Sequence, residues 1–115
     1  NPYNKICPSG LEESFLPEFN RGRKRYLNEE ISENNNQINR IENEVKHLKT
    51  DLAQKTSLVS RYQYAPQNDQ TINLLNNARS QVRSLEYEIS NKETNLSSLR
   101  NKNREFKLEL VKLGN

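Results

Sequence analysis

The sequence has little of what a globular core requires. It contains no Trp, no Met and three Phe among 115 residues, and only 31% of its residues are hydrophobic while 29% are charged. A compact single core is therefore excluded, and any fold must follow narrow apolar seams. Because the apolar residues recur at a helical period, we expect an ordered helical chain and not a disordered one.

Disulfides and long apolar runs are also missing. Cys7 is the sole cysteine, which excludes an internal disulfide and a disulfide-stapled secreted domain. No stretch approaches the roughly 18 apolar residues of a membrane span, and no signal-peptide pattern is visible. We expect an intracellular protein, cytoplasmic or peripheral to a membrane, with the nucleus also compatible. Since the first residue is Asn and the helical pattern continues almost to the end, we expect a segment of a larger protein.

Motifs that carry chemistry are lacking as well. There is no Gly-rich phosphate loop, no paired Cys or Cys/His metal spacing and no nucleophile elbow. His47 is the only histidine, and a solvated surface residue is a better interpretation than a zinc or catalytic role. Cys7 is by default an inert tail cysteine. The sequence therefore predicts a protein that is not an enzyme and has no cofactor or metal site.

Two long segments carry a 4,3 apolar spacing, which is typical of a coiled-coil seam. The first spans residues 27–63 and the second spans 69–113, with a turn at 64–68 that contains Pro66. Asp69 or Asn68 offers an N-cap, and Gly114 offers a C-terminal stop. Two such helices joined by a short turn predict an all-α fold, an antiparallel coiled-coil hairpin.

The register of this hairpin follows from matching the two seams. When paired residue numbers sum to 137, every layer joins an a position to a d position: Tyr62 with Leu75, Val59 with Ala78, Leu52 with Leu85, Leu48 with Ile89, Ile41 with Leu96, Ile38 with Leu99, Ile31 with Phe106 and Leu27 with Leu110. The same sum pairs Asn34 with Asn103, which predicts a hydrogen-bonded, register-setting layer. Parallel pairing of each helix with a second copy, and hence a homodimer, is the alternative.

Residues 1–26 form a separate N-terminal segment in this interpretation. Ser9 and Glu12 have capping-box spacing for a short helix at about 10–16, and Pro17 is expected to end it. Leu11, Phe15 and Phe19 share one apolar face. We expect that face to pack on the open end of the hairpin or to bind a partner.

Basic residues gather at the open end of the predicted hairpin. Arg21, Arg23, Lys24 and Arg25 approach a second group of basic residues in this register: Arg100, Lys102, Arg104, Lys107 and Lys112. Of this second group, Arg100, Arg104 and Lys107 are the candidate partner-binding residues. Such a cluster could attract an acidic protein, an anionic membrane surface or nucleic acid, and the alternative is a solvated face interleaved with glutamates. Nucleic acid is disfavoured because no aromatic residues interleave. Near the turn, Tyr62 and Tyr64 either form a recognition tip or close the seam.

One family resemblance accompanies these patterns. Ile41-Glu42-Asn43-Glu44-Val45 through Lys55 and Tyr62, the short polar turn, and Ala78 to Leu99 with Leu85-Glu86 and Leu96-Ser97-Ser98-Leu99 resemble the antiparallel coiled-coil finger of Rho-effector proteins, the homology-region domain of protein-kinase-C-related kinases. The family usually has Lys-x-Gly-Ala where this chain has Lys55-Thr56-Ser57-Leu58. The resemblance implies binding of a Rho-type small GTPase.

The sequence thus predicts a protein-protein interaction module, a scaffold or tether in a trafficking or cytoskeletal protein. Its alternatives are a GTPase effector domain and membrane-surface attachment through the basic open end.

Overall fold

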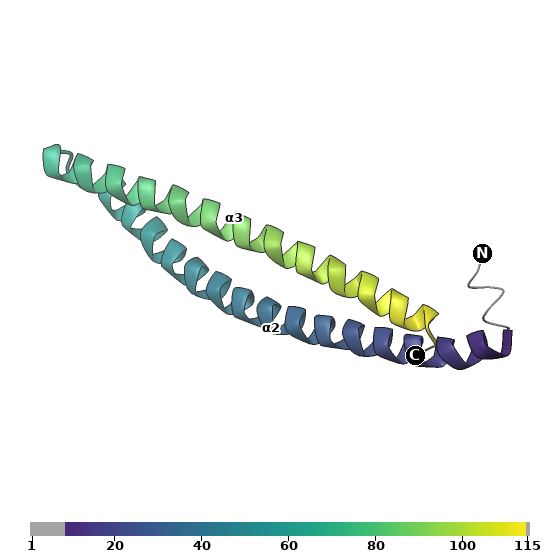
Figure 1. Cartoon of the computed structure of the whole chain (residues 1–115). Coiled ribbons are helices and arrows are strands. Elements are labelled where there is room, and N and C mark those ends of the chain that lie inside the picture. Colours follow the sequence, from purple (N-terminus) through teal and green to yellow (C-terminus); the bar gives the residue numbers. More distant parts are fainter. Residues whose placement is uncertain (1–8, 115) are drawn as a thin grey trace. The chain divides into compact units, whose positions relative to one another are not determined.

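The computed structural model describes residues 9–114, and it describes side chains from residue 17 onward. Helix α2 spans Ser9–Gln63 and helix α3 spans Asp69–Lys112, with residues 64–68 between them (Figure 1). The two long helices pack against each other, which confirms the all-α helical hairpin. Helices of 55 and 44 residues also confirm that most of the chain is helical.

Pro17 does not end a helix, so the predicted break before the hairpin is wrong. Helix α2 begins at Ser9 and continues through Pro17 into the first seam. A proline inside a helix removes one backbone hydrogen bond and costs about 3 kcal/mol, and it does not force a stop. Pro17 itself is exposed.

The chain forms two compact units. Unit 1 comprises Asn1–Asn36 with Arg100–Asn115, and unit 2 comprises Gln37–Leu99. In unit 2, the core consists of buried Ile38, Val45, Ile89 and Leu96, with Ile41, Leu48, Leu52 and Leu99 packed against it. These residues include the predicted layers Leu48 with Ile89, Ile41 with Leu96 and Ile38 with Leu99. The heptad pattern therefore located the residues that hold this unit together.

Unit 1 has its own apolar cluster and a polar layer. Leu27, Ile31 and Leu110 are buried, and Leu27 has no exposed surface. Asn34 Nδ2 donates a 2.9 Å hydrogen bond to Oδ1 of Asn103, and both side chains are buried. This bond confirms the predicted pairing of Asn34 with Asn103. No buried side-chain nitrogen or oxygen among the described residues lacks a partner, so the polar layer is internally satisfied.

The turn is fixed by side-chain hydrogen bonds. Asn68 caps α3: its Oδ1 accepts from the Thr71 amide at 2.9 Å, while the Asn68 amide donates to Thr71 Oγ1 at 2.9 Å. This reciprocal pair is a capping box with threonine as the third helical residue. Gln67 Nε2 donates to the carbonyls of Tyr62 and Ala65. At the other end of α3, Gly114 has φ +82°, the left-handed conformation predicted for a glycine stop.

Candidate partner-binding surface

The two sides of unit 1 can be named from the heptad. Seam residues occupy positions a and d; position e lies beside a, and position g lies beside d. Arg23 and Glu109 both occupy g positions, and they form a bidentate ion pair with contacts of 2.5 and 3.0 Å. This pair marks one flank of the seam, which we call the g side. The opposite flank, made of e and b positions, is the e side.

The ion pair on the g side is partly exposed but well formed. The hydrogen bond that Arg23 donates to Glu109 is the main reason that the pKa of Glu109 lies below its usual value. The same bond raises the pKa of Arg23. The Arg23 guanidinium also lies 5.0 Å from the centre of the Tyr26 ring. Arg23 is therefore occupied within unit 1 and is not available as an independent contact for a partner.

The e side of unit 1 collects basic side chains. We call these residues the basic face: Arg21, Arg25, Arg100, Arg104 and Lys107, all exposed. The other e and b positions of the paired region carry Asn28, Ser32, Asn35 and Val111. Glutamates of the same stretch occupy positions f, g and c instead: Glu29, Glu30, Glu33, Glu105 and Glu109. Glu18 also falls at a b position, but it lies past the end of α3 in this register. The charges of unit 1 are thus segregated by side.

Most of the positive charge of this face has no acidic partner among the described residues. Among the described residues, no ion pair involves Arg21, Arg25, Arg104 or Lys107. Arg104 Nη2 donates to the neutral Asn101 Oδ1 at 2.8 Å, which positions the guanidinium and leaves its charge intact. Two exposed aliphatic side chains, Leu108 and Val111, lie one turn from Arg104 and Lys107 on α3. The basic face therefore borders a small apolar strip.

The predicted site residues separate into three groups. The basic face holds five of them. Arg23 lies on the g side, and Lys24 occupies a seam position where it is partly buried. Phe19 is 57% exposed at a c position, away from the basic face, while Leu11 and Phe15 lie outside the residues whose side chains are described. Assigning the charged residues outside the seam to heptad positions e and b would have revealed from the sequence that basic and acidic residues lie on different sides.

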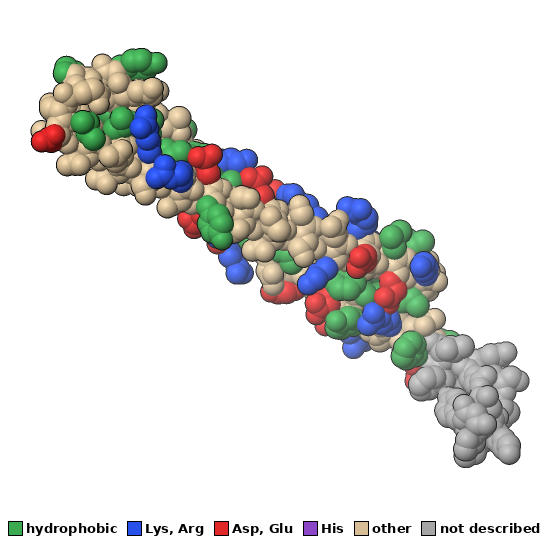
Figure 2. All heavy atoms as spheres, turned by 90° about the horizontal axis from the view of Figure 1, so that it is seen from above, with side chains coloured by type: hydrophobic (Ala, Val, Ile, Leu, Met, Phe, Trp, Pro, Cys, Tyr) green, Lys and Arg blue, Asp and Glu red, His purple; other side chains and the backbone are tan. Residues whose placement is uncertain are grey.

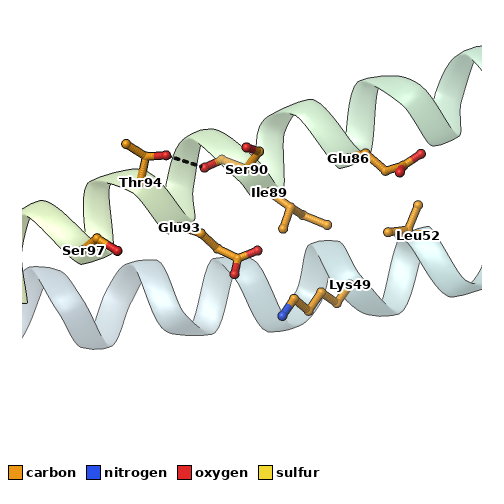
Figure 3. A pocket seen from close by; sticks show the side chains of 8 residues that line it. All are labelled: Lys49, Leu52, Glu86, Ile89, Ser90, Glu93, Thr94 and Ser97. Atoms are coloured by element: carbon orange, nitrogen blue, oxygen red, sulfur yellow. Dashed lines mark hydrogen bonds between the residues drawn. The ribbon is translucent and has the colours of Figure 1, made fainter.

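Unit 2 has a shallow groove of about 470 Å³ on its own e side (Figure 3). Leu52 and Ile89 form part of its lining, together with Lys49 from α2 and Glu86 and Glu93 from α3. The Thr94 hydroxyl donates to the Ser90 carbonyl at 3.0 Å, so it is engaged by its own helix. Opposite charges in an open groove favour a solvated surface over a site that concentrates one kind of charge.

A cross-helix ion pair supports unit 2 on the other flank. Lys92 occupies a seam position, and its Nζ donates to Glu44 Oε2 at 2.7 Å. This hydrogen bond is the main cause of the lowered pKa of Glu44 and of the raised pKa of Lys92. The Lys92 side chain thus reaches a carboxylate on the neighbouring helix although it starts from a seam position.

The turn end of unit 2 is poor in charge. Asp69 is the only charged residue between Arg61 and Arg79. Tyr64 is 85% exposed, Ile72 and Leu74 are also exposed, and Figure 2 shows mainly uncharged atoms over this end, at the upper left. Tyr62 is partly buried and closes the seam. Tyr62 thus lies at the end of the seam, whereas Tyr64 is exposed to solvent.

Further features bear on function. No group of three His, Cys, Asp or Glu side chains that could hold a metal occurs in the described part. No helix in residues 9–114 contains an apolar stretch sufficient to cross a bilayer.

No protein-family model matches the chain, and searches of curated proteins and of solved structures return no match.

Proposed function

We propose that this chain is a non-enzymatic protein-interaction module, a scaffold or tether segment of a larger intracellular protein, with the basic face of unit 1 as its principal contact surface. The observation that carries the proposal is the segregation of charge in unit 1. A face that is merely solvated interleaves acids and bases, because neighbouring opposite charges stabilise the helix. Here the basic side chains stand together and the carboxylates occupy other positions.

The choice of basic residue also supports a contact surface. Four of the five residues of the basic face are arginine, whereas Lys24, Lys102 and Lys112 lie elsewhere in the same unit. Arginine is enriched in protein interfaces because its planar guanidinium is weakly hydrated and binds carboxylates through two hydrogen bonds. Lysine is depleted there and is favoured on solvated surfaces. The arginine of the g side, Arg23, already has an internal carboxylate partner.

Two alternatives remain as candidate functions of the same hairpin. The resemblance to Rho-effector fingers, from Ile41 to Phe106, supports a GTPase-binding role, which requires binding that depends on the GTP-bound state. The basic face with Leu108 and Val111 supports attachment to an anionic membrane, which requires binding to vesicles. Neither alternative explains the preference for arginine as directly as an acidic protein partner does.

Site-specific photo-crosslinking tests the proposal. A photoreactive residue in place of Ser32, which lies on the e side, should give a discrete protein adduct in cells of the source organism. The double substitution Arg104→Glu with Lys107→Glu should remove that adduct. The matched control is a photoreactive residue in place of Glu105, an exposed position on the opposite side. Equal adducts at both positions, or adducts to lipid or nucleic acid alone, would contradict the proposal.

A further inference from the structure

We infer that the basic face binds an acidic helix that lies lengthwise along unit 1, as a third helix beside α2 and α3. This inference rests on the proposed function and specifies the partner's chemistry and shape. It follows from the spacing of the positive charges, from the side chains between them, and from the small apolar strip at the end of α3.

The charges recur about once per helical turn. The Asn34–Asn103 layer fixes the relative position of the two helices, so distances along unit 1 can be counted from it. Arg104, Lys107, Arg25 and Arg21 lie one, four, nine and thirteen residues from this layer, all toward the same end of unit 1. At 1.5 Å per residue, the steps between these four charges are about 4.5 to 7.5 Å and together they span about 18 Å.

A helix presents charges at the same interval. Glutamates at i, i+4, i+7 and i+11 share one face of a helix and are separated along its axis by about 4.5 to 6 Å. An acidic helix can therefore offer one carboxylate to each of Arg104, Lys107, Arg25 and Arg21. An acidic loop or a single acidic side chain would match one or two charges and leave the others unpaired.

The residues between the charges favour a protein over a membrane. Asn28, Ser32 and Asn35 are small polar side chains, and Asn35 Oδ1 accepts a hydrogen bond from Asn103 Nδ2 at 2.9 Å. Membrane-surface helices gain affinity by burying large apolar side chains, and on this face only Val111 is apolar, with Leu108 at its edge. That pair is too small to hold a bilayer, but it can contact an apolar residue at one end of a partner helix.

Nucleic acid fits the face less well. Single-stranded nucleic acid is held by aromatic side chains that stack on bases, and the e and b positions of the paired region carry no aromatic residue. Tyr26, next to Arg25, occupies a c position and lies against Arg23, and Phe106, next to Lys107, packs against the apolar cluster of unit 1.

The inference can be tested with two synthetic helices of about 20 residues, a length that covers the face. The striped peptide carries Glu at i, i+4, i+7 and i+11 on an Ala/Gln background. The scattered peptide has the same composition, with its glutamates distributed around the helix. Anisotropy titrations with the full chain should show the striped peptide binding about tenfold tighter or more, with affinity that falls as salt rises.

Matched variants place the contact on the basic face. Arg104→Glu with Lys107→Glu should weaken binding of the striped peptide about tenfold or more. Lys102→Glu with Lys112→Glu changes net charge equally on the same helix, but both residues lie off the e side, so the loss should stay within about threefold. If the first double variant fails to fold, as judged by circular dichroism, Arg104→Gln with Lys107→Gln replaces it.

The outcomes distinguish this inference from the proposed function. Equal binding of the two peptides that still requires Arg104 and Lys107 would overturn the acidic helix and leave a protein-binding face. Equal losses in both double variants would overturn the basic face as the contact. Tighter binding to phosphatidylserine vesicles than to the striped peptide, with no protein adduct at Ser32, would overturn both.

Discussion

Asn34 and Asn103 lie 69 residues apart in the chain, and their amides meet at 2.9 Å inside unit 1. Asn103 also donates to Asn35, so three side chains share one network, in which Asn34 and Asn103 are buried and Asn35 is exposed. A polar layer of this kind fixes register at a cost in stability, because shifting either helix would strand an amide against hydrocarbon. The pairing of the helices in unit 1 therefore depends on hydrogen bonds as well as on apolar packing.

Replacing this layer with leucine tests its role. We predict that Asn34→Leu with Asn103→Leu raises the melting temperature while allowing other registers or oligomers, because leucines satisfy the seam without specifying an offset. Each single change leaves a buried amide without its main partner. The free energy of unfolding of the double variant should therefore exceed the value obtained by adding the two single effects by about 1 to 3 kcal/mol. Thermal melts of the four proteins measure the coupling. Strictly additive single and double changes would mean that the residues do not share a layer.

The buried cluster of unit 1 gives a second prediction. Leu27 has no exposed surface, so Leu27→Ala should lower the free energy of unfolding by about 2 to 5 kcal/mol through lost burial and a cavity. Leu108 is 56% exposed, and Leu108→Ala is the matched control with an expected change within about 0.5 kcal/mol. Urea unfolding of both variants provides the comparison. Similar losses would show that the seam of unit 1 is not packed as described.

The cap at the turn gives a third prediction. Asn68→Ala removes the acceptor for the Thr71 amide and should destabilise the protein by about 1 kcal/mol. Thr71→Ala removes the reciprocal acceptor, and the double variant should lose less than the sum, because the two side chains form one unit. Asn73→Ala, in the next turn at an exposed position, serves as the control. An Asn73→Ala loss as large as the Asn68→Ala loss would argue against the capping box.

The ion pairs predict acid sensitivity. The pKa of Glu44 and that of Glu109 are both lowered from 4.5 by hydrogen bonds to Lys92 and Arg23. Below 4.5 the unfolded chain binds protons at these sites before the folded chain does, so stability falls as the pH drops below 4.5 toward the lower folded pKa values. Glu44→Gln with Glu109→Gln should flatten this part of the pH profile. Melting temperatures between pH 5 and pH 2 provide the test, and an unchanged slope would contradict the assignment.

Much of this fold was predictable because, in a coiled coil, the apolar residues that repeat at heptad positions a and d are the residues that pack between the helices. The sum of 137 paired Asn34 with Asn103, and the structure contains that hydrogen bond. The same sum paired Leu48 with Ile89, and Leu48 packs against the core cluster of unit 2 to which Ile89 belongs. Pro17 was misjudged because the preference of residues before proline is statistical, whereas a long helix can tolerate one missing hydrogen bond. The reach of Lys92 to Glu44 depends on side-chain rotamers, which no spacing rule contains.

The surface was harder to predict, since charge clusters look alike in sequence whether or not they share a side. Arg23 and Arg25 are two residues apart in sequence. Arg23 forms an ion pair with Glu109, whereas Arg25 belongs to the basic face. The two roles, internal ion pair and exposed basic face, are distinguished only when every neighbouring residue, acidic residues included, is assigned to its heptad position.

The separation of charge in unit 1 also gives it an electric dipole directed across its width. A charged partner approaching through solution would experience a torque as well as an attraction, so collisions would tend to occur with one face turned toward the partner. Orientation of this kind acts over about one Debye length, about 8 Å at physiological ionic strength, and is lost in strong salt. The arrangement of the glutamates, none of which need touch the partner, would thus help determine how often an encounter becomes a complex.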